Sequence, residues 1–350
     1  MTAVIHIGGR PVGPGQAPFV IAEVGINHNG DLALALDTID AIAAAGAHCA
    51  KFQNYRTEDF ILDRSLTYEY LSRGETVRES QYDMFKRCEL DGDGLARLKE
   101  RCDARGIAFM STPTGTAGID DLVRLGAPAL KNGSDFLTHL ELIAAMARTG
   151  LPTILSTGMA TGEEIDDAVA AYRAAGGRDL VLLHCVSLYP TPLHLANVRR
   201  VATLAETYGC LAGFSDHTDG TAAAIAAACA GAAVIEKHVT LDKNLPGPDH
   251  RFSADADELG TLVRHLAEVH AAMGRADLEP TAEESGMRAD CRLSCVAVRD
   301  LDSGHPLARA DIGFYRPGTG LPPKRVGDLV GRCLDRGVAP GHVFTDSDFA

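Results

Sequence analysis

This sequence has no excess of basic residues: 33 Lys and Arg stand against 47 Asp and Glu, for a formal net charge of −14. Because nucleic-acid binding needs a basic face, we expect no nucleic-acid partner. No apolar run reaches the roughly 20 residues that span a bilayer, so we expect no membrane partner. The stretch from Met1 to His6 lacks the basic and apolar regions of a signal peptide, which predicts a cytoplasmic protein.

The nine cysteines contain no Cys-x-x-Cys pair. Cys88, Cys102, Cys210 and Cys229 lie in helical or apolar stretches, which predicts reduced core residues. Cys185 ends a predicted strand beside proposed site residues. We expect it to line the pocket rather than act as a nucleophile, because the chemistry argued below needs none.

Short apolar runs alternate with amphipathic or Ala-rich stretches from Phe19 to about His238. Eight strands separated by helices predict an α/β protein with a (β/α)8 TIM barrel, and a doubly wound open sheet is the alternative. The predicted strands are Phe19–Glu23, Ala47–Gln53, Ala108–Thr112, Ala129–Lys131, Thr153–Ser156, Val181–Cys185, Leu211–Ser215 and Ala233–His238.

Helix signals support this alternation. Asp31 begins a helical run that ends near Gly46, and Thr161 to Glu164 is a capping-box pattern before a helix that Gly176 closes. The segment 56–80 is long for a connection between a strand and a helix. It predicts a lid or substrate loop, with a solvated loop as the alternative.

The texture of the sequence changes near Glu279. We expect a barrel over residues 1–278, a linker over 279–289 and a small β-rich domain over 290–350. A domain of about 60 residues is near the lower limit for independent folding. We therefore expect it to pack on the barrel or on a partner chain.

Catalytic groups of a barrel lie at the C-terminal ends of its strands. Glu23 ends the first strand and is a general acid/base or a sugar-binding group, with helix capping or a salt bridge as the alternative. A lysine inside a barrel is costly unless it meets an anion, although a single one can reach the rim. Two such lysines with nearby hydroxyls predict a cradle for phosphate and carboxylate: Lys51, Lys131, Thr112, Ser134, Ser156 and Ser215.

His217 and His238 follow the seventh and eighth strands. Two neutral imidazoles with water and substrate oxygens suit a divalent transition metal, Mn²⁺ or Zn²⁺. Each histidine alone is more often a structural residue, but the pair with Asp216 and Asp249 nearby favours metal binding. His28, His184 and His250 are alternatives at the same end of the barrel.

Six tracts together resemble the sialic acid synthases, also called N-acetylneuraminate synthases, over essentially the whole chain. The last 60 residues resemble the antifreeze-like (SAF) domain of that family, including the tract Arg316-Pro317-Gly318-Thr319-Gly320. The six tracts are Ala22–Gly30, Lys51–Gln53, Leu155–Met159, Tyr189–Pro192, Phe214–Thr218 and Gly247–His250.

The resemblance implies an enzyme that condenses phosphoenolpyruvate with an N-acylated hexosamine such as N-acetylmannosamine. It implies a divalent metal, Mn²⁺ first and Mg²⁺ second, on His217 and His238. Phosphoenolpyruvate would meet Lys51, Thr112, Lys131, Ser134, Ser156, Ser187 and Ser215, and the sugar would meet Glu23, Gln53, Tyr189, Asp249 and Arg292. It also implies a domain-swapped homodimer, in which the SAF domain covers the partner's barrel and supplies Arg292.

In the implied reaction, C3 of phosphoenolpyruvate attacks the open-chain aldehyde of the sugar, with metal assistance. Water then captures C2, and the intermediate releases phosphate by C–O cleavage. The lysines neutralise the anion, while Glu23 and Asp249 handle protons. Lys131 is assigned a catalytic role, and replacing it with Ala is expected to abolish turnover.

Two positions depart from the family pattern. Phe136 stands where a glutamate near the sugar is usual, with Asp135 beside it, and Ser187 stands where an asparagine can occur. The acceptor can therefore be a 2,4-diacetamido sugar instead. A synthase for a phosphorylated sugar, of the 9-phosphate or 3-deoxy-octulosonate 8-phosphate type, is an alternative that would use basic residues such as Arg73 and Arg78. A non-catalytic carbohydrate-binding protein is the remaining one.

Overall fold

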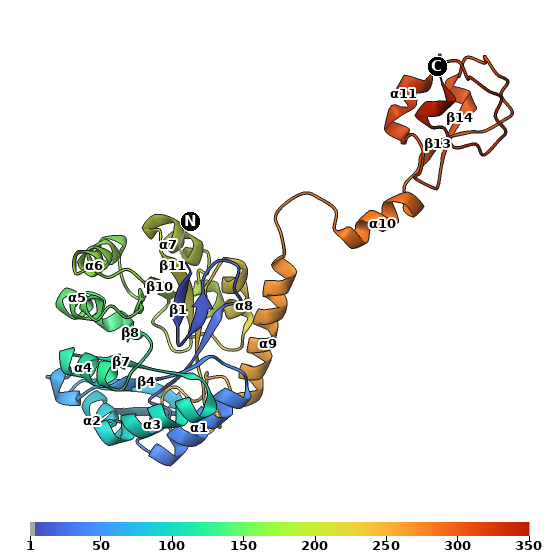
Figure 1. Cartoon of the computed structure of the whole chain (residues 1–350). Helices are drawn as coiled ribbons and strands as arrows, with labels where there is room; N and C mark the ends of the chain where they lie inside the picture. Colours follow the sequence, from blue (N-terminus) through green and yellow to red (C-terminus); the bar gives the residue numbers. More distant parts are fainter. Residues whose placement is uncertain (1–3, 350) are drawn as a thin grey trace. The chain divides into compact units, whose positions relative to one another are not determined.

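A computed structural model of the chain describes residues 4–349. The chain forms two compact units, the first ending at Gly274 and the second beginning at Arg275 (Figure 1). The boundary therefore lies before the predicted residue 278, because helix α9 (Ala256–Met273) ends at Gly274, whose φ of 47° stops the helix. Within residues 4–349, no helix is long and apolar enough to cross a membrane.

The first unit is built on an eight-stranded parallel sheet, which confirms the predicted (β/α)8 fold. The strand order is β7-β4-β3-β12-β11-β10-β9-β8, and the terminal strands β7 and β8 contact each other, so the sheet closes on itself. All eight predicted strands are present: β3 (Phe19–Gly25), β4 (Cys49–Asn54), β7 (Ala108–Pro113), β8 (Leu130–Asn132), β9 (Thr153–Ser156), β10 (Leu180–Cys185), β11 (Leu211–Asp216) and β12 (Val234–His238).

The strands alternate between an inner and an outer face, as β-strands must. Ile21, Val181 and Val234 pack with one another in a single inner cluster. The hairpin of β1 (Ile5–Ile7) and β2 (Arg10–Val12), which we did not predict, adds apolar side chains to the same cluster. The inner apolar layers thus occupy the N-terminal part of the barrel, and the polar inner residues lie at its C-terminal end.

Helices surround the strands (Figure 1). Both predicted helix starts are confirmed: Asp31 accepts a hydrogen bond from Ala33 N (2.8 Å), and Thr161 and Glu164 form a reciprocal capping box. The helices that cover the barrel with α9 are α1 (Leu32–Ala44), α3 (Gly92–Arg105), α4 (Thr116–Arg124), α5 (Leu140–Arg148), α6 (Gly162–Ala174), α7 (Arg200–Tyr208) and α8 (Ala222–Cys229).

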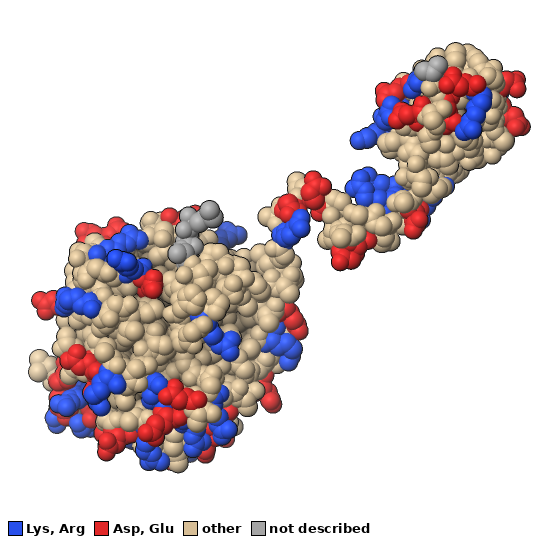
Figure 2. Space-filling model, in the orientation of Figure 1, with Lys and Arg blue, Asp and Glu red and all other residues tan. Residues whose placement is uncertain are grey.

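Three of the four cysteines predicted as core residues are buried, but Cys229 is exposed. The buried positions of α8 include Ala224 and Ala227. Cys229 follows Ala227 by two residues, about 200° around the helix, which turns it to solvent. Figure 2 shows that basic side chains on the visible face of this unit lie among acidic ones.

The long segment after β4 folds into a hairpin, β5 (Thr67–Ser72) and β6 (Glu75–Ser80), followed by helix α2 (Gln81–Arg87). Arg73 and Gly74 at its tip both have positive φ, as tight hairpin turns require. The tip reaches the connection between β12 and α9. Arg73 Nε donates to Asn244 O (2.9 Å), and Gly247 N donates to Ser72 Oγ (3.3 Å). This segment is therefore a hairpin whose tip packs on the connection between β12 and α9.

The second unit contains α10 (Ala282–Cys291), β13 (Ser294–Ala297), β14 (Ile312–Tyr315) and α11 (Val326–Leu329). Helix α10 occupies most of the stretch 279–289 that we expected to be a linker, and a capping box at Thr281 starts it. A small apolar core that includes Leu301, Leu307 and Phe344 holds the rest together. This unit has the antiparallel pairing of the predicted SAF domain.

The second unit contains two copies of one arrangement. In each copy, a buried aspartate pairs with an arginine and a histidine, and the three residues have the same spacing in the sequence. The two sets are Arg299, His305 and Asp311, with distances of 2.7 and 2.8 Å, and Arg336, His342 and Asp348, with distances of 3.0 and 3.0 Å. Each aspartate thus fixes one loop of this unit.

Candidate functional site

The C-terminal end of the barrel, here called the mouth, gathers polar side chains from the inner faces of seven strands. The alternation that buries Ile21 below also points Glu23 inward from β3, and the same holds for Lys51 on β4 and Lys131 on β8. Glu23, Lys51 and Lys131 are only 2%, 3% and 2% exposed. The predicted convergence of two lysines inside the barrel is therefore what the structure shows.

Lys51 lies between two carboxylates. Its Nζ is 2.7 Å from Glu23 Oε2 and 3.6 Å from Glu236 Oε2, and it donates to Thr112 Oγ1 (3.2 Å). Burial disfavours the charged lysine, but the two carboxylates outweigh it and raise the pKa of Lys51. The amine is therefore a permanent cation at the floor of the mouth.

Glu236 is a site residue that the sequence interpretation missed. Its Oε1 accepts from Ser215 Oγ (2.9 Å), and its Oε2 has no hydrogen-bond partner among the described residues. Burial alone would raise the pKa of Glu236, but Lys131 and Lys51 outweigh it and lower the pKa. The sequence does indicate this position, because Glu236 lies two residues before His238 on one strand and the two side chains must share a face.

Lys131 donates to Ser156 Oγ (2.7 Å) and to Asn132 O (2.8 Å). Burial lowers its pKa. A bound anion would stabilise the charged form of Lys131 and would find the Ser156 hydroxyl beside it. The structure thus brings Lys51, Thr112, Lys131, Ser156 and Ser215 into one polar floor.

Gly158, after β9, leaves room for three polar atoms. A Cβ on Gly158 would lie 2.4 Å from Ser187 Oγ, 2.7 Å from Ser134 Oγ and 3.0 Å from Cys185 Sγ. Gly158 N donates to Ser134 Oγ (3.0 Å), and this hydroxyl is 3.1 Å from Cys185 Sγ. Burial raises the pKa of Cys185, so it lines the site as a neutral thiol.

His217 and His238 face each other with ring centroids 5.4 Å apart. Since His217 Nδ1 is 2.8 Å from the carbonyl of Val186, Nδ1 carries the proton. Nε2 keeps its lone pair and lies 3.4 Å from Ser215 Oγ, which donates to Glu236. His238 Nδ1 has no hydrogen-bond partner in the described part of the chain, and it lies 3.7 Å from Asp249 Oδ2. Burial lowers the pKa of both histidines, so both are neutral.

Neutral imidazoles with free lone pairs are what a divalent transition metal needs, so these two residues fit the implied ion. Within residues 4–349, no group of three or more His, Cys, Asp or Glu side chains could hold a metal. The pair would therefore need water or substrate oxygens to complete the coordination, as expected for an ion that touches substrate.

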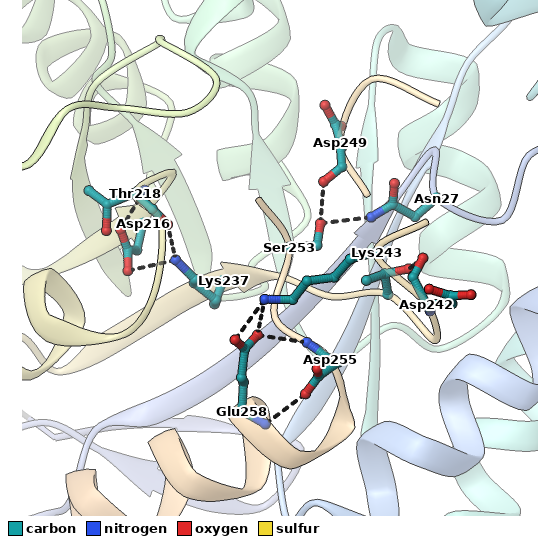
Figure 3. Close-up of polar contacts among 11 residues, drawn as sticks. Asn27, Asp216, Thr218, Lys237, Asp242, Lys243, Asp249, Ser253, Asp255 and Glu258 are labelled. Carbon is teal, nitrogen blue, oxygen red and sulfur yellow. Dashed lines mark hydrogen bonds and ion pairs between the residues drawn. The ribbon is translucent and has the colours of Figure 1, made fainter. Parts of the chain in front are cut away.

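Asp249 lies in the connection between β12 and α9. Ser253 Oγ donates to Asp249 O (2.6 Å), and Asn27 Nδ2 donates to Ser253 Oγ (2.9 Å), which anchors this connection to the end of β3 (Figure 3). Burial and the nearby Glu23 carboxylate raise the pKa of Asp249 to about 7. Burial also raises the pKa of Glu23 to about 7. Both carboxyl groups can hold a proton near neutral pH.

Gln53 and Tyr189, two predicted sugar-binding residues, lie beside these groups. Gln53 Nε2 donates to Glu23 Oε1 (3.4 Å). The Tyr189 ring lies over His217 with centroids 4.3 Å apart, and Phe252 packs on His238 at 5.4 Å. Tyr189 and the unpredicted Phe252 therefore form aromatic walls around the histidine pair.

Other predicted residues have local partners. His250 Nδ1 is 2.7 Å from Thr240 Oγ1, and His184 Nε2 is 2.8 Å from Ala196 O. His28 Nδ1 accepts from Gly30 N (3.1 Å). These three alternative histidines thus have structural partners. Arg292 ends α10 in the second unit, and its place at a mouth stays a prediction.

Phe136 belongs to an aromatic group, with its ring centroid 6.4 Å from that of Phe60. Asp135 Oδ1 bends back over Gly133, where a Cβ would lie 2.4 Å away. Burial raises the pKa of Asp135 and outweighs Lys131 and Lys51, which act to lower it. Asp135 thus supplies a carboxyl group next to Phe136, and its use in place of the family's glutamate stays a prediction.

Comparison with known proteins places this arrangement in a family. Residues 38–277 match the model of the NeuB family, and residues 294–350 match the SAF domain. The N,N'-diacetyllegionaminic acid synthase of Legionella pneumophila is 36% identical over 95% of this chain and 95% of that protein. The pseudaminic acid synthase of Helicobacter pylori is 32% identical over 91% of this chain and 93% of that protein.

A solved structure agrees with these sequences. The crystal structure of N-acetylneuraminic acid synthetase from Leptospira borgpetersenii superposes with a TM-score of 0.75 at 34% identity, covering 82% of this chain and 95% of that one. Sequence and fold therefore lead to the same assignment. The chain belongs to the NeuB family, ends in a SAF domain, and is an enzyme of the phosphoenolpyruvate-dependent, carbon–carbon bond-forming type.

Proposed function

We propose that this enzyme condenses phosphoenolpyruvate with an N-acylated hexosamine, assisted by a divalent metal ion, to give a nonulosonic acid and inorganic phosphate. The observation that carries the proposal is the pair of buried lysines, Lys51 and Lys131, on the floor of the mouth. Buried cations need anionic partners, and a ligand with a carboxylate and a phosphate supplies two. The names of the relatives support a sialic-type product.

An anionic ligand has to compete with the carboxylates that already contact Lys51. Glu23 and Glu236 now neutralise Lys51, so an incoming anion competes with them. Because the pKa of Glu23 is already raised to about 7, the approach of more negative charge favours its protonated form. Ligand binding would thus load a proton onto Glu23, while the hydroxyls of Thr112 and Ser156 accompany the lysines to the anion.

His217 and His238 would hold the metal ion, with Mn²⁺ favoured over Mg²⁺, and the ion would supply Lewis-acid polarisation of the acceptor's aldehyde oxygen. Attack of C3 on the aldehyde carbon turns that oxygen into a hydroxyl, and Asp249 supplies the proton. Asp249, left as a carboxylate, takes the proton that Glu23 gained on ligand binding. Water then adds to C2 and gives a proton to the ionised Glu23. The C2–O bond to phosphate then breaks as the C2 hydroxyl becomes a ketone, and its proton leaves with the phosphate.

The acceptor is N-acetylmannosamine or a 2,4-diacetamido sugar. Phe136 cannot accept a hydrogen bond from a sugar hydroxyl, and its contact with Phe60 makes this part of the rim apolar. An acetamido substituent carries a methyl group that an aromatic wall can cover. This argument, with the name of the Legionella relative, supports the 2,4-diacetamido sugar.

A phosphorylated acceptor would need basic residues at the far end of the sugar. Of the two arginines considered for this role, Arg73 Nε donates to Asn244 O, and Arg78 Nε donates to Thr67 Oγ1 (3.1 Å). Both thus have local partners in the hairpin or next to it. We therefore place the phosphorylated acceptor second, and non-catalytic carbohydrate binding last.

Phosphate release from phosphoenolpyruvate with Mn²⁺ tests the proposal across a panel of acceptors. The panel contains N-acetylmannosamine, its 6-phosphate, a 2,4-diacetamido-hexose and arabinose 5-phosphate. We expect release that depends on a non-phosphorylated N-acyl sugar and stops with a chelator. If only a phosphorylated sugar gives phosphate release, the acceptor is a phosphorylated sugar instead. If no acceptor gives release and phosphoenolpyruvate does not bind, the carbohydrate-binding alternative is favoured.

We also propose a homodimer in which the SAF domain of one chain supplies Arg292 to the mouth of the other. Mixing Arg292→Ala with Lys131→Ala protein tests this, because only a swapped dimer can rebuild one intact site from two inactive chains. Recovered activity after co-refolding supports the swap. Two inactive parents that stay inactive as a mixed dimer would contradict it.

A further inference from the structure

We infer that a buried ion pair between Asp216 and Lys237 positions His217 and His238 to share one divalent cation. The inference rests on the proposed function, since it assigns a role toward the proposed metal. Asp216 ends β11 and Lys237 lies on β12, and the two residues are direct partners in the register of the parallel pair. Figure 3 shows the contact between Asp216 and Lys237. In the sequence, each of the two residues directly precedes one histidine of the pair.

The contacts of this ion pair hold the backbone on both sides of His217. Lys237 Nζ lies 3.0 Å from Asp216 Oδ2 and donates to Thr218 O (2.5 Å). Asp216 Oδ1 accepts from Thr218 N (2.9 Å). The residue before His217 and the residue after it are thus both tied to Lys237 of the neighbouring strand.

The ion pair lies on the outer face of the sheet, behind the histidines. Side chains alternate along a strand, so Asp216 and Lys237 point away from the mouth while His217 and His238 point into it. The side chains of Asp216 and Lys237 are 0% and 1% exposed, respectively. The pair is therefore removed from the substrates and acts on the site only through the backbone.

Stability alone does not account for two buried charges. Desolvation of a buried pair often cancels its attraction, and apolar residues of similar size frequently replace such a pair without loss of stability. Metal ligation is more demanding, because both ligand nitrogens must lie within a few tenths of an ångström of their places. An ion pair that joins β11 to β12 next to both histidines meets that demand.

His238 depends most on this tie. Its Nδ1 has no hydrogen-bond partner among the described residues, whereas His217 Nδ1 is held by Val186 O. The ring contact with Phe252 is apolar and sets no hydrogen-bond direction. The backbone next to Lys237 therefore sets where the His238 ring stands relative to His217.

The test is the affinity of the full chain for Mn²⁺. It is measured by titration, with the electron paramagnetic resonance signal of the free ion as the readout. The double variant Asp216→Asn/Lys237→Met removes both charges and leaves no buried unpaired ion. We expect Mn²⁺ to bind 10- to 100-fold more weakly, the usual effect of losing a residue that orients a ligand. Affinity for phosphoenolpyruvate, titrated without metal, should stay within threefold of wild type.

Asp40→Asn is the matched control. Asp40 pairs with Arg101 (2.7 Å) and Arg105 (2.7 Å) on the helical shell, so its loss removes ion pairs away from the histidines. We expect unchanged Mn²⁺ affinity in this variant. If Asp40→Asn weakened Mn²⁺ binding as much as the double variant, the effect would be one of general stability and the inference would fail.

The remaining outcomes separate the inference from the proposed function. Unchanged Mn²⁺ affinity in the folded double variant overturns the inference alone. Wild-type protein that binds no Mn²⁺ overturns the metal part of the proposed function, and the inference with it. If the double variant does not fold, Lys237→Arg keeps the charge but alters the contacts to Asp216 and Thr218. Weaker Mn²⁺ binding is then expected, and unchanged binding refutes the inference.

Discussion

Replacing Gly158 with Ala tests the predicted anion cradle with a single added methyl group. The new Cβ would lie 2.4 Å from Ser187 Oγ and 2.7 Å from Ser134 Oγ. An ordinary contact needs at least 3.4 Å, so the Ser187 hydroxyl must move by about 1 Å (3.4 − 2.4). Hydroxyls at the ends of short side chains can do so, and we expect the variant to fold with little loss of stability.

The cost appears in the binding of phosphoenolpyruvate. A hydrogen bond to a charged group contributes about 1.5–3 kcal/mol. Displacing two hydroxyls from their places, with partial compensation by water, then costs about 3 kcal/mol. Since 1.4 kcal/mol corresponds to a factor of ten, kcat/KM for phosphoenolpyruvate should fall by about 10²-fold, mostly through KM.

The assay is phosphate release at fixed acceptor concentration, with a thermal melt for each variant. Gly162→Ala is the matched control, because a Cβ at Gly162 meets nothing within 4 Å and Gly162 is the first residue of α6. It should behave as wild type. A KM for phosphoenolpyruvate within threefold of wild type in folded Gly158→Ala protein would show that Ser134 and Ser187 do not hold the anion.

Three further predictions concern buried charges. Lys131→Ala loses its bonds to Ser156 Oγ and Asn132 O, and we expect kcat to fall by at least about 10³-fold; near-normal turnover would remove Lys131 from the catalytic residues. Because the folded-state pKa of Asp249 is raised from 3.8 to about 7, its contribution to stability is present below pH 4 and is lost as the pH rises through about 7. In urea titrations, Asp249→Asn should lack that part of the pH dependence, and an unchanged slope would refute the assignment. The bonds from Ala308 N and His305, with Arg299, lower the pKa of Asp311 to about 2, so its contribution is present above about pH 4 and is lost as the pH falls through about 2. Asp311→Asn should speed amide exchange across residues 294–349 at neutral pH, and equal exchange rates would contradict that role.

The sequence predicts the barrel well because its strands are short and buried on both faces. Such strands appear as short, nearly continuous apolar runs between helical stretches. The C-terminal ends of the strands then place Lys51, Lys131 and the two histidines at one mouth. Glu236 lies two residues before His238 on one strand, but its contacts with Lys51 and Ser215 come from other strands. Those contacts depend on strand register, which the apolar pattern does not specify.

Two of the missed elements, helix α10 and the hairpin β5–β6, bury little apolar surface. Helix α10 has no buried residue, so its capping box at Thr281 stood in a stretch that otherwise appeared to be a linker. Apart from Ser72, every residue of the hairpin β5–β6 is exposed or half-buried, so the hairpin lacks the buried apolar face that marks a strand. The pairing of Asp216 with Lys237 depends on strand register, which a pattern of apolar runs does not specify.

The most direct test of the central claim follows the oxygen that bridges C2 and phosphorus in phosphoenolpyruvate. Enzyme, Mn²⁺ and a 2,4-diacetamido-hexose or N-acetylmannosamine would be supplied with substrate carrying ¹⁸O at that position. A condensation that captures water at C2 and cleaves the C–O bond sends the label into inorganic phosphate. Unlabelled phosphate, with ¹⁸O kept in the organic product, or release that does not depend on the sugar, would contradict the account.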